Sequence, residues 1–170
     1  MQQLIRHGEQ AMMQYVDEQN NAQTITVAQY VNDNLSQDKL SFSTPLFNDI
    51  LQETLRHTGD AVFHAEHYFI NHSNPTYSTL AAELVAEKYQ LSKDHLHTDN
   101  VVGEEECLYD LMLHLTVNYK MSIMEEKLKE IMNKLRQPEI SNDQQKVMEV
   151  MAQYKELLET KQKIAKILGD

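Results

Sequence analysis

The clearest pattern of apolar and polar positions lies in residues 120–170, where it predicts a helical hairpin. Apolar side chains recur at alternating spacings of three and four, which places them on one face of an α-helix and suits antiparallel packing. The first set is Met121, Met124, Leu128, Ile131 and Leu135, and the second is Val147, Met151, Tyr154, Leu158, Ala165 and Leu168. Lys161 interrupts the second set, and Gln137-Pro138 separates the two. We expect arms at about residues 104–136 and 142–168.

The second arm is apolar over more of its surface than one partner helix requires. Beside its stripe it carries Val150, Leu157, Ile164 and Ile167. One interpretation is that these side chains pack on the rest of the chain, as apolar helix faces usually do. The other is that they form an interface with another protein. Neither interpretation is catalytic.

Residues 1–119 are divided into shorter helices by capping residues, glycine and proline. An opening helix is expected from about Gln3 to Val16. Thr26 is expected to cap a second helix, and Thr44-Pro45 to start a third over 46–55. The apolar positions of the first two helices are Leu4, Ile5, Met12 and Tyr15, followed by Val27, Tyr30 and Val31.

The remaining helix boundaries are read in the same way. Gly59-Asp60 starts a fourth helix through Ile70. Asn74-Pro75 starts a fifth that ends near Tyr89 and buries Leu80, Ala81, Leu84 and Val85. Ser92 or Asp94 caps one more turn, and a long helix without glycine or proline runs from Glu104 to about Arg136. Ser141 or Asn142 caps the last helix and Gly169 closes it.

These elements predict an all-α chain. It consists of a compact N-terminal helical bundle at residues 1–119, a long connecting helix and a C-terminal helical hairpin at residues 120–170. The whole sequence has only 4 glycines and 3 prolines. Such a composition leaves few sharp turns and favours helices over a many-stranded sheet.

Charge is distributed unevenly between these two parts. Residues 1–119 carry 5 basic and 17 acidic side chains, whereas residues 120–170 carry 10 and 9. An acidic bundle repels phosphate backbones, so we expect no direct binding of nucleic acid through it. The single cysteine, Cys107, excludes an internal disulfide and fits a cytoplasmic location. No apolar run is long enough to suggest a membrane span.

The sequence offers little catalytic chemistry. His64 and His67 share a helix face, near other possible metal ligands at Glu66, His72, His95 and His97. We expect both histidines to be exposed, because they fall opposite the apolar side chains of Val62, Phe63, Phe69 and Ile70. Their spacing also differs from that of zinc protease helices, and no phosphate-binding loop or nucleophile elbow is present. We therefore expect neither an enzyme nor a metal site.

Several segments, taken in order, resemble one known family. They are Pro45-Leu46-Phe47, Phe69-Ile70-Asn71-His72 before Pro75, Leu80-Ala81-Ala82, Tyr89-Gln90-Leu91-Ser92-Lys93, Leu108-Tyr109-Asp110-Leu111 and Lys163-Ile164-Ala165-Lys166-Ile167-Leu168-Gly169-Asp170. Together they resemble the C-terminal helicase-binding domain of bacterial DNA primase. The resemblance covers nearly the whole chain and depends on order and spacing.

The resemblance implies a function in docking. In that family the domain contacts the N-terminal domains of the hexameric replicative helicase, mainly through its hairpin, and brings primer synthesis to the replication fork. It implies partner-binding candidates at Tyr154, Leu157, Lys161, Ile164 and Leu168, a chain that is monomeric alone, and no cofactor. The zinc and magnesium of a primase would belong to parts that this sequence lacks, so it would be an isolated, non-catalytic domain.

Two other functions remain open from the residues alone. A helical scaffold would use the hairpin for self-association or for another partner. A helical metalloenzyme would use the histidine-rich segment.

Overall fold

The computed structural model describes residues 1–16, 20, 22–91 and 104–168, with side chains described within 1–16, 20, 22–86 and 108–167. The described chain is mostly helical, as expected, with one small antiparallel sheet. It divides into two compact units, Met1–Met112 and Leu113–Asp170. The boundary expected between residues 119 and 120 falls inside the second unit.

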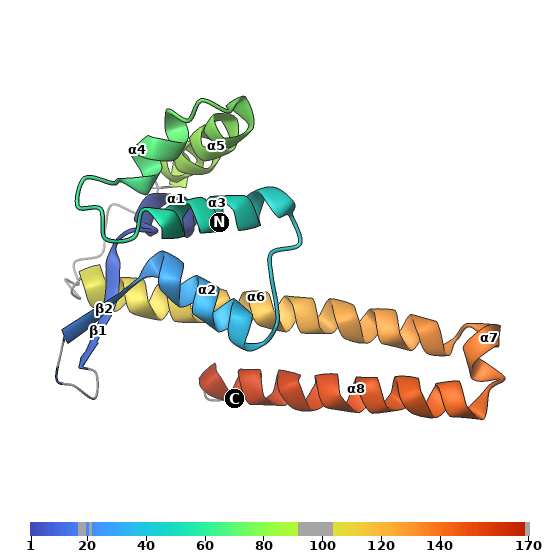
Figure 1. The fold of residues 1–170 in the computed structure, drawn as a ribbon. Helices are drawn as coiled ribbons and strands as arrows, with labels where there is room; N and C mark the ends of the chain where they lie inside the picture. The colour runs from blue at the N-terminus through green and yellow to red at the C-terminus, as the bar shows by residue number, and fades with distance from the viewer. Residues whose placement is uncertain (17–19, 21, 92–103, 169–170) are drawn as a thin grey trace. The chain divides into compact units, whose positions relative to one another are not determined.

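In its described residues, the first unit contains five helices, a two-stranded sheet and the beginning of the long helix (Figure 1). These elements are α1 (Gln2–His7), β1 (Ala11–Val16), β2 (Ala22–Thr26), α2 (Val27–Gln37), α3 (Pro45–Arg56), α4 (Ala65–Ile70), α5 (Pro75–Leu91) and α6 (Glu104–Leu135). Helix α1 packs against α2, α4 and α5, and α2 packs against α3 and the sheet. The largest fully buried side chains of the first unit are Phe69, Ile5, Ile50 and Val27.

The opening helix is much shorter than expected, and a strand takes its second half. Helix α1 ends at His7, and β1 pairs with β2 in the region predicted to be helical. At Gly8 a Cβ would overlap the Leu4 carbonyl and lie 2.8 Å from Thr54 Cγ2, so the chain passes α3 where only glycine fits. Tyr15 is 49% exposed rather than on a buried helix face.

The next two helix starts agree with their sequence signals. Thr26 and Gln29 form a capping box at the start of α2, with Gln29 N donating to Thr26 Oγ1 at 3.3 Å. Pro45 occupies the first turn of α3, although Thr44 makes no side-chain capping bond. Helix α5 begins at Pro75 as expected and buries Ala81.

The fourth helix begins later than expected. Gly59 adopts a left-handed backbone (φ 92°), and Asp60 Oδ1 accepts from Val62 N at 3.0 Å, so these residues form a turn. Helix α4 starts only at Ala65. Val62, which was expected on a buried helix face, is consequently 82% exposed.

The second unit consists of the rest of α6, the short helix α7 (Pro138–Ser141), α8 (Gln144–Ala165) and the 3₁₀ turn η1 (Lys166–Leu168). Figure 1 shows α8 running back along α6 after α7. Helix α7 was not predicted from the sequence. The cap of α8 is Asp143 rather than the predicted Asn142 or Ser141. Asp143 Oδ1 accepts from the backbone N–H groups of Gln145 and Lys146. The predicted caps Ser92, Asp94 and Gly169 lie outside the described residues.

Candidate functional site

The five predicted partner-binding residues of the hairpin differ widely in accessibility. Tyr154, Leu157 and Lys161 are half-buried, and Ile164 is only 3% exposed. The side chain of Leu168 lies outside the described residues. Ile164 is thus an interior side chain of the structure rather than a freely exposed anchor.

The protected face of α8 includes most of the predicted stripe and extends beyond it. Val147, Tyr154, Leu158 and Ala165 of the stripe are half-buried. Val150, Leu157, Lys161 and Ile164, which lie beside the stripe or interrupt it, are also half-buried or buried. Met151, which was predicted to lie in the stripe, is 49% exposed. Residues 150 and 151 are both apolar, and sequence spacing alone does not choose between them.

Lys161, the polar interruption of the stripe, makes an ion pair between the two arms. Its Nζ lies 2.9 Å from Glu125 Oε1, and the Lys161 side chain is 25% exposed. The hydrogen bond from Lys161, reinforced by its positive charge, lowers the pKa of Glu125. The lysine therefore keeps its ammonium group paired while its aliphatic stem lies along the apolar face.

Several large apolar side chains of the hairpin face solvent in the described structure. On α8, Met148 is 67% exposed and Met151 is 49% exposed, and Ile167 of η1 is 52% exposed. Met132 of α6 is 40% exposed. Met148 and Met151 are spaced i,i+3 and are neighbours on the α8 surface. We call these two residues the methionine pair. Met151 was predicted to lie in the packed stripe, and Met148 was not among the predicted partner-binding residues.

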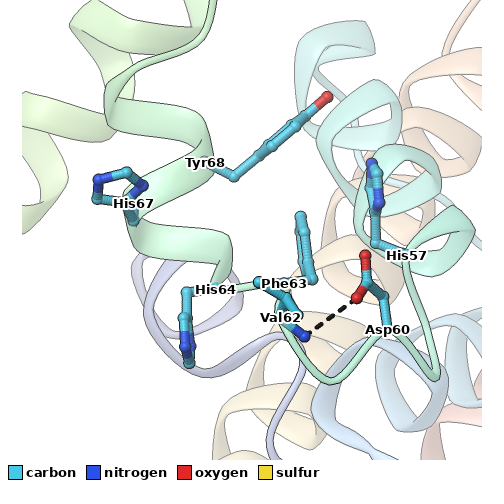
Figure 2. Close-up of a pocket in the computed structure, with 7 residues that line it drawn as sticks. All are labelled: His57, Asp60, Val62, Phe63, His64, His67 and Tyr68. Atoms are coloured by element: carbon cyan, nitrogen blue, oxygen red, sulfur yellow. Dashed lines mark hydrogen bonds between the residues drawn. The ribbon is translucent and has the colours of Figure 1, made fainter.

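The first unit contains a second candidate site, at the turn between α3 and α4. Two hollows of about 260 and 470 Å³ adjoin there and share His57, Asp60, Phe63 and His64. Tyr68 and His67 line the smaller one and Glu9 lines the larger one. We call this region the acidic hollow. Figure 2 shows Asp60 and His57 on the α3 side of Phe63, with Tyr68 above them on α4.

Aromatic rings pack closely on one side of the acidic hollow. The His57 ring stacks on Phe63 with centroids 4.5 Å apart and an interplanar angle of 6°, and Tyr68 lies 5.3 Å from Phe63. The Tyr68 hydroxyl donates to Glu53 Oε1 at 2.7 Å, and this bond, with burial and the charge of Glu53, raises the pKa of Tyr68. Phe63 and Phe69 are buried, as the sequence predicted.

The two carboxylates of the acidic hollow have different environments. Asp60 uses one oxygen to accept from Val62 N. Glu9 Oε1 lies 3.5 Å from His64 Nδ1, whereas Glu9 Oε2 is buried and has no hydrogen-bond partner among the described residues. Glu9 therefore meets the exposed His64 side chain through Oε1, while its Oε2 atom is enclosed by the chain.

Histidine exposure agrees with the sequence reading. His64 and His67 are both exposed. Within the described part of the chain, no group of three or more histidine, cysteine, aspartate or glutamate side chains is arranged to hold a metal ion. His95 and His97, two of the possible ligands, lie outside the described residues. None of the described helices is long and apolar enough to cross a membrane.

Comparisons with known proteins show the family to which the chain belongs. Neither the curated proteins nor the solved structures contain a significant match to this sequence. A family model described as "Domain of unknown function (DUF8430)" matches residues 1–170. The chain belongs to this DUF8430 family.

Proposed function

We propose that this chain is the helicase-binding region of a bacterial DNA primase, a non-catalytic domain that docks on the N-terminal domains of the hexameric replicative helicase. The observation that carries the proposal is the order of the segments that resemble this primase domain, from Pro45-Leu46-Phe47 to the closing residues 163–170. Docking would couple primer synthesis to the replication fork in the cytoplasm.

The architecture is compatible with that role. Pro45 and Pro75, which belong to the resembling segments, begin α3 and α5. The second unit ends in a helical hairpin, the element through which the resembling domain makes its main contact. The hairpin also exposes large apolar side chains, which are common at protein interfaces.

The methionine pair is the part of α8 best placed for such a contact. Met148 and Met151 are exposed, flexible and polarizable, and methionine adapts well to a partner surface. Tyr154 and Leu157 are half-buried and could contribute their accessible portions. Lys161 and Ile164 instead support the hairpin, since one is paired with Glu125 and the other is buried.

The proposal is tested by size-exclusion chromatography with light scattering. The chain is mixed with the replicative helicase of the same organism, either full-length or without its N-terminal domain. Co-elution with the full-length helicase alone is expected. Failure to co-elute with the full-length helicase, while circular dichroism shows a folded chain, would contradict the proposal.

A matched pair of double variants locates the contact. Met148→Glu with Met151→Glu introduces two negative charges on the proposed contact surface and should abolish co-elution. Gln153→Glu with Gln162→Glu introduces the same charge at exposed polar positions of α8 and should leave it intact. Equal binding by both variants would show that the helicase contacts another surface.

The same exposed side chains favour one alternative, a scaffold that self-associates through its hairpin. Two copies could bury the methionine pairs against each other. Light scattering of the chain alone distinguishes this function, because a scaffold gives a mass that rises with concentration. A constant monomer mass would exclude self-association under those conditions.

A further inference from the structure

The acidic hollow has the charge of a site for a cation. Its only full charges at neutral pH, with histidine counted as neutral, are the carboxylates of Glu9 and Asp60, and no lysine or arginine is among its described lining residues. A partly enclosed site with carboxylates and no opposing cation attracts positive charge.

Glu9 provides a specific acceptor inside this site. Its Oε2 atom is buried without a hydrogen-bond partner among the described residues, and its Oε1 atom approaches only His64, whose side chain is 73% exposed. The enclosed Oε2 atom is closed to a group that enters the hollow, so an incoming donor would bind Glu9 at Oε1. Because His64 is largely exposed, an incoming donor could replace it beside Glu9.

The aromatic side of the hollow favours a planar cation. His57, Phe63 and Tyr68 form a continuous set of rings with centroid separations between 4.5 and 5.3 Å. A guanidinium group packs on aromatic surfaces and directs several N–H donors in its plane toward carboxylates. A guanidinium group that enters the hollow could pack on the accessible parts of His57 and Tyr68 and direct its donors toward the carboxylates.

A bare metal ion fits the hollow less well than an organic cation. No set of three or more potential ligands is close enough together to hold a metal within the described residues, and that includes Glu9, Asp60 and the described histidines. A guanidinium group has donors on different nitrogen atoms and can serve carboxylates that are too far apart to share one ion.

We propose that the acidic hollow binds the guanidinium group of an arginine side chain presented by a peptide segment of a partner protein. This site lies in the first unit, involves none of the hairpin residues discussed above, and does not depend on the proposed docking to helicase. The chain would thus have a second protein-recognition site that reads a basic side chain.

The test is an NMR titration of the whole ¹⁵N-labelled chain without any helicase. The probe is the capped tripeptide acetyl-Gly-Arg-Gly-amide, and the control is acetyl-Gly-Gln-Gly-amide, which has the same backbone without the charge. The arginine peptide should give saturable shifts of the backbone signals between Thr58 and Phe63. Absence of saturable shifts there, or equal shifts with the glutamine peptide, would overturn the proposal.

Variants connect the binding to the carboxylates. Glu9→Gln should weaken binding of the arginine peptide about tenfold, because a charge-assisted hydrogen bond is replaced by a neutral one. Glu83→Gln removes the same charge from an exposed position on α5 that lines neither hollow, and should bind like the wild type. Equal affinity of the two variants would refute the role of Glu9.

Two further experiments complete the test. If the Glu9→Gln spectrum shows an unfolded chain, Asp60→Asn, whose amide oxygen can still accept from Val62 N, replaces it with the same expected loss. Guanidinium chloride at the peptide concentration should bind more weakly than the arginine peptide. Equal binding would show that the hollow takes a free cation and would overturn the assignment to a peptide.

Discussion

A single methyl group added at Gly8 should lower the stability of the chain, because the folded structure has no room for it. Replacing it with alanine places a Cβ atom 2.8 Å from Thr54 Cγ2, whereas ordinary contacts lie between 3.4 and 4 Å. Thr54 is 1% exposed, and its hydroxyl donates to Ile50 O at 2.8 Å, so its side chain is held in place. The new methyl would also overlap the Leu4 carbonyl.

The expected cost follows from these contacts. Overpacking a rigid core typically destabilises by about 1–3 kcal/mol. Removing glycine from the unfolded chain offsets this by about 0.4–1 kcal/mol. We expect Gly8→Ala to lower the free energy of unfolding by about 1–2 kcal/mol, which corresponds to a fall in Tm of about 4–8 °C for a unit of this size.

A double-mutant cycle, measured by urea unfolding with circular dichroism, tests the cause. Thr54→Ser removes the methyl group that collides with the new Cβ and keeps the hydroxyl that donates to Ile50. If the Thr54 methyl is responsible, Gly8→Ala should cost at least about 0.5 kcal/mol less in the Thr54→Ser background. The overlap with the Leu4 carbonyl should remain and make the rescue partial.

Two results would refute this reasoning. If Gly8→Ala stabilises the chain, space at Gly8 is not limiting. If its cost is the same with threonine or serine at position 54, the collision with the Thr54 methyl group is not the cause of the destabilisation.

Three other predictions concern single side chains. Ile164→Ala should lower the free energy of unfolding by about 2–5 kcal/mol, because Ile164 is buried. Ile167→Ala, at a 52% exposed position, should change it by less than about 0.5 kcal/mol. Equal losses in the two variants would contradict the burial pattern. The pKa of Asp143 is lowered because backbone N–H groups, first that of Lys146, donate to its carboxylate. Its capping contribution to stability should therefore be complete above the unfolded pKa and disappear as the pH falls through the folded pKa. Helicity measured against pH should show this loss in the wild type and not in Asp143→Ala. The raised pKa of Tyr68 means that its stabilising contribution is present below the unfolded value and is lost as pH rises through the folded one, and the difference in ultraviolet titration between wild type and Tyr68→Phe should appear at a higher pH than for free tyrosine.

Much of the helical framework was predictable because local signals determine where these helices start. The start signals of α2, α3 and α5 are Thr26 with Gln29, Pro45 and Pro75. Each acts within one helical turn of the helix start, so these starts can be predicted directly from the sequence. The absence of glycine and proline between Glu104 and Arg136 similarly predicted the long α6.

The sheet was missed because its cause is not local. Residues 11–16 have no strict alternation of apolar and polar side chains, and the need for glycine at position 8 arises from Thr54 of α3, which is far away in the sequence. The exposure of Met151 on α8 was missed for a related reason. Val150 and Met151 are both apolar and adjacent, so the sequence spacing does not show which of them is protected in the folded hairpin.

The acidic hollow could not be found from spacing. Glu9 belongs to the connection between α1 and β1, whereas Asp60 and Phe63 follow α3, and packing brings them together. The spacing of the histidines suggested only a possible metal site, and nothing in the sequence around Glu9 indicated a role for it. An unpaired buried carboxylate oxygen is a property of the folded chain alone.

The ion pair of Lys161 with Glu125 restricts how the two arms of the hairpin can slide past each other. If α8 shifted by one helical turn along α6, the ammonium group would leave Glu125 and come to the level of Met121 in one direction or Lys129 in the other. An apolar or like-charged neighbour is unfavourable for a lysine, so the pair favours the observed alignment, as polar residues do in coiled coils. Lys161 therefore helps to set the register of α8 against α6, and with it the position of Met148 and Met151 along the hairpin.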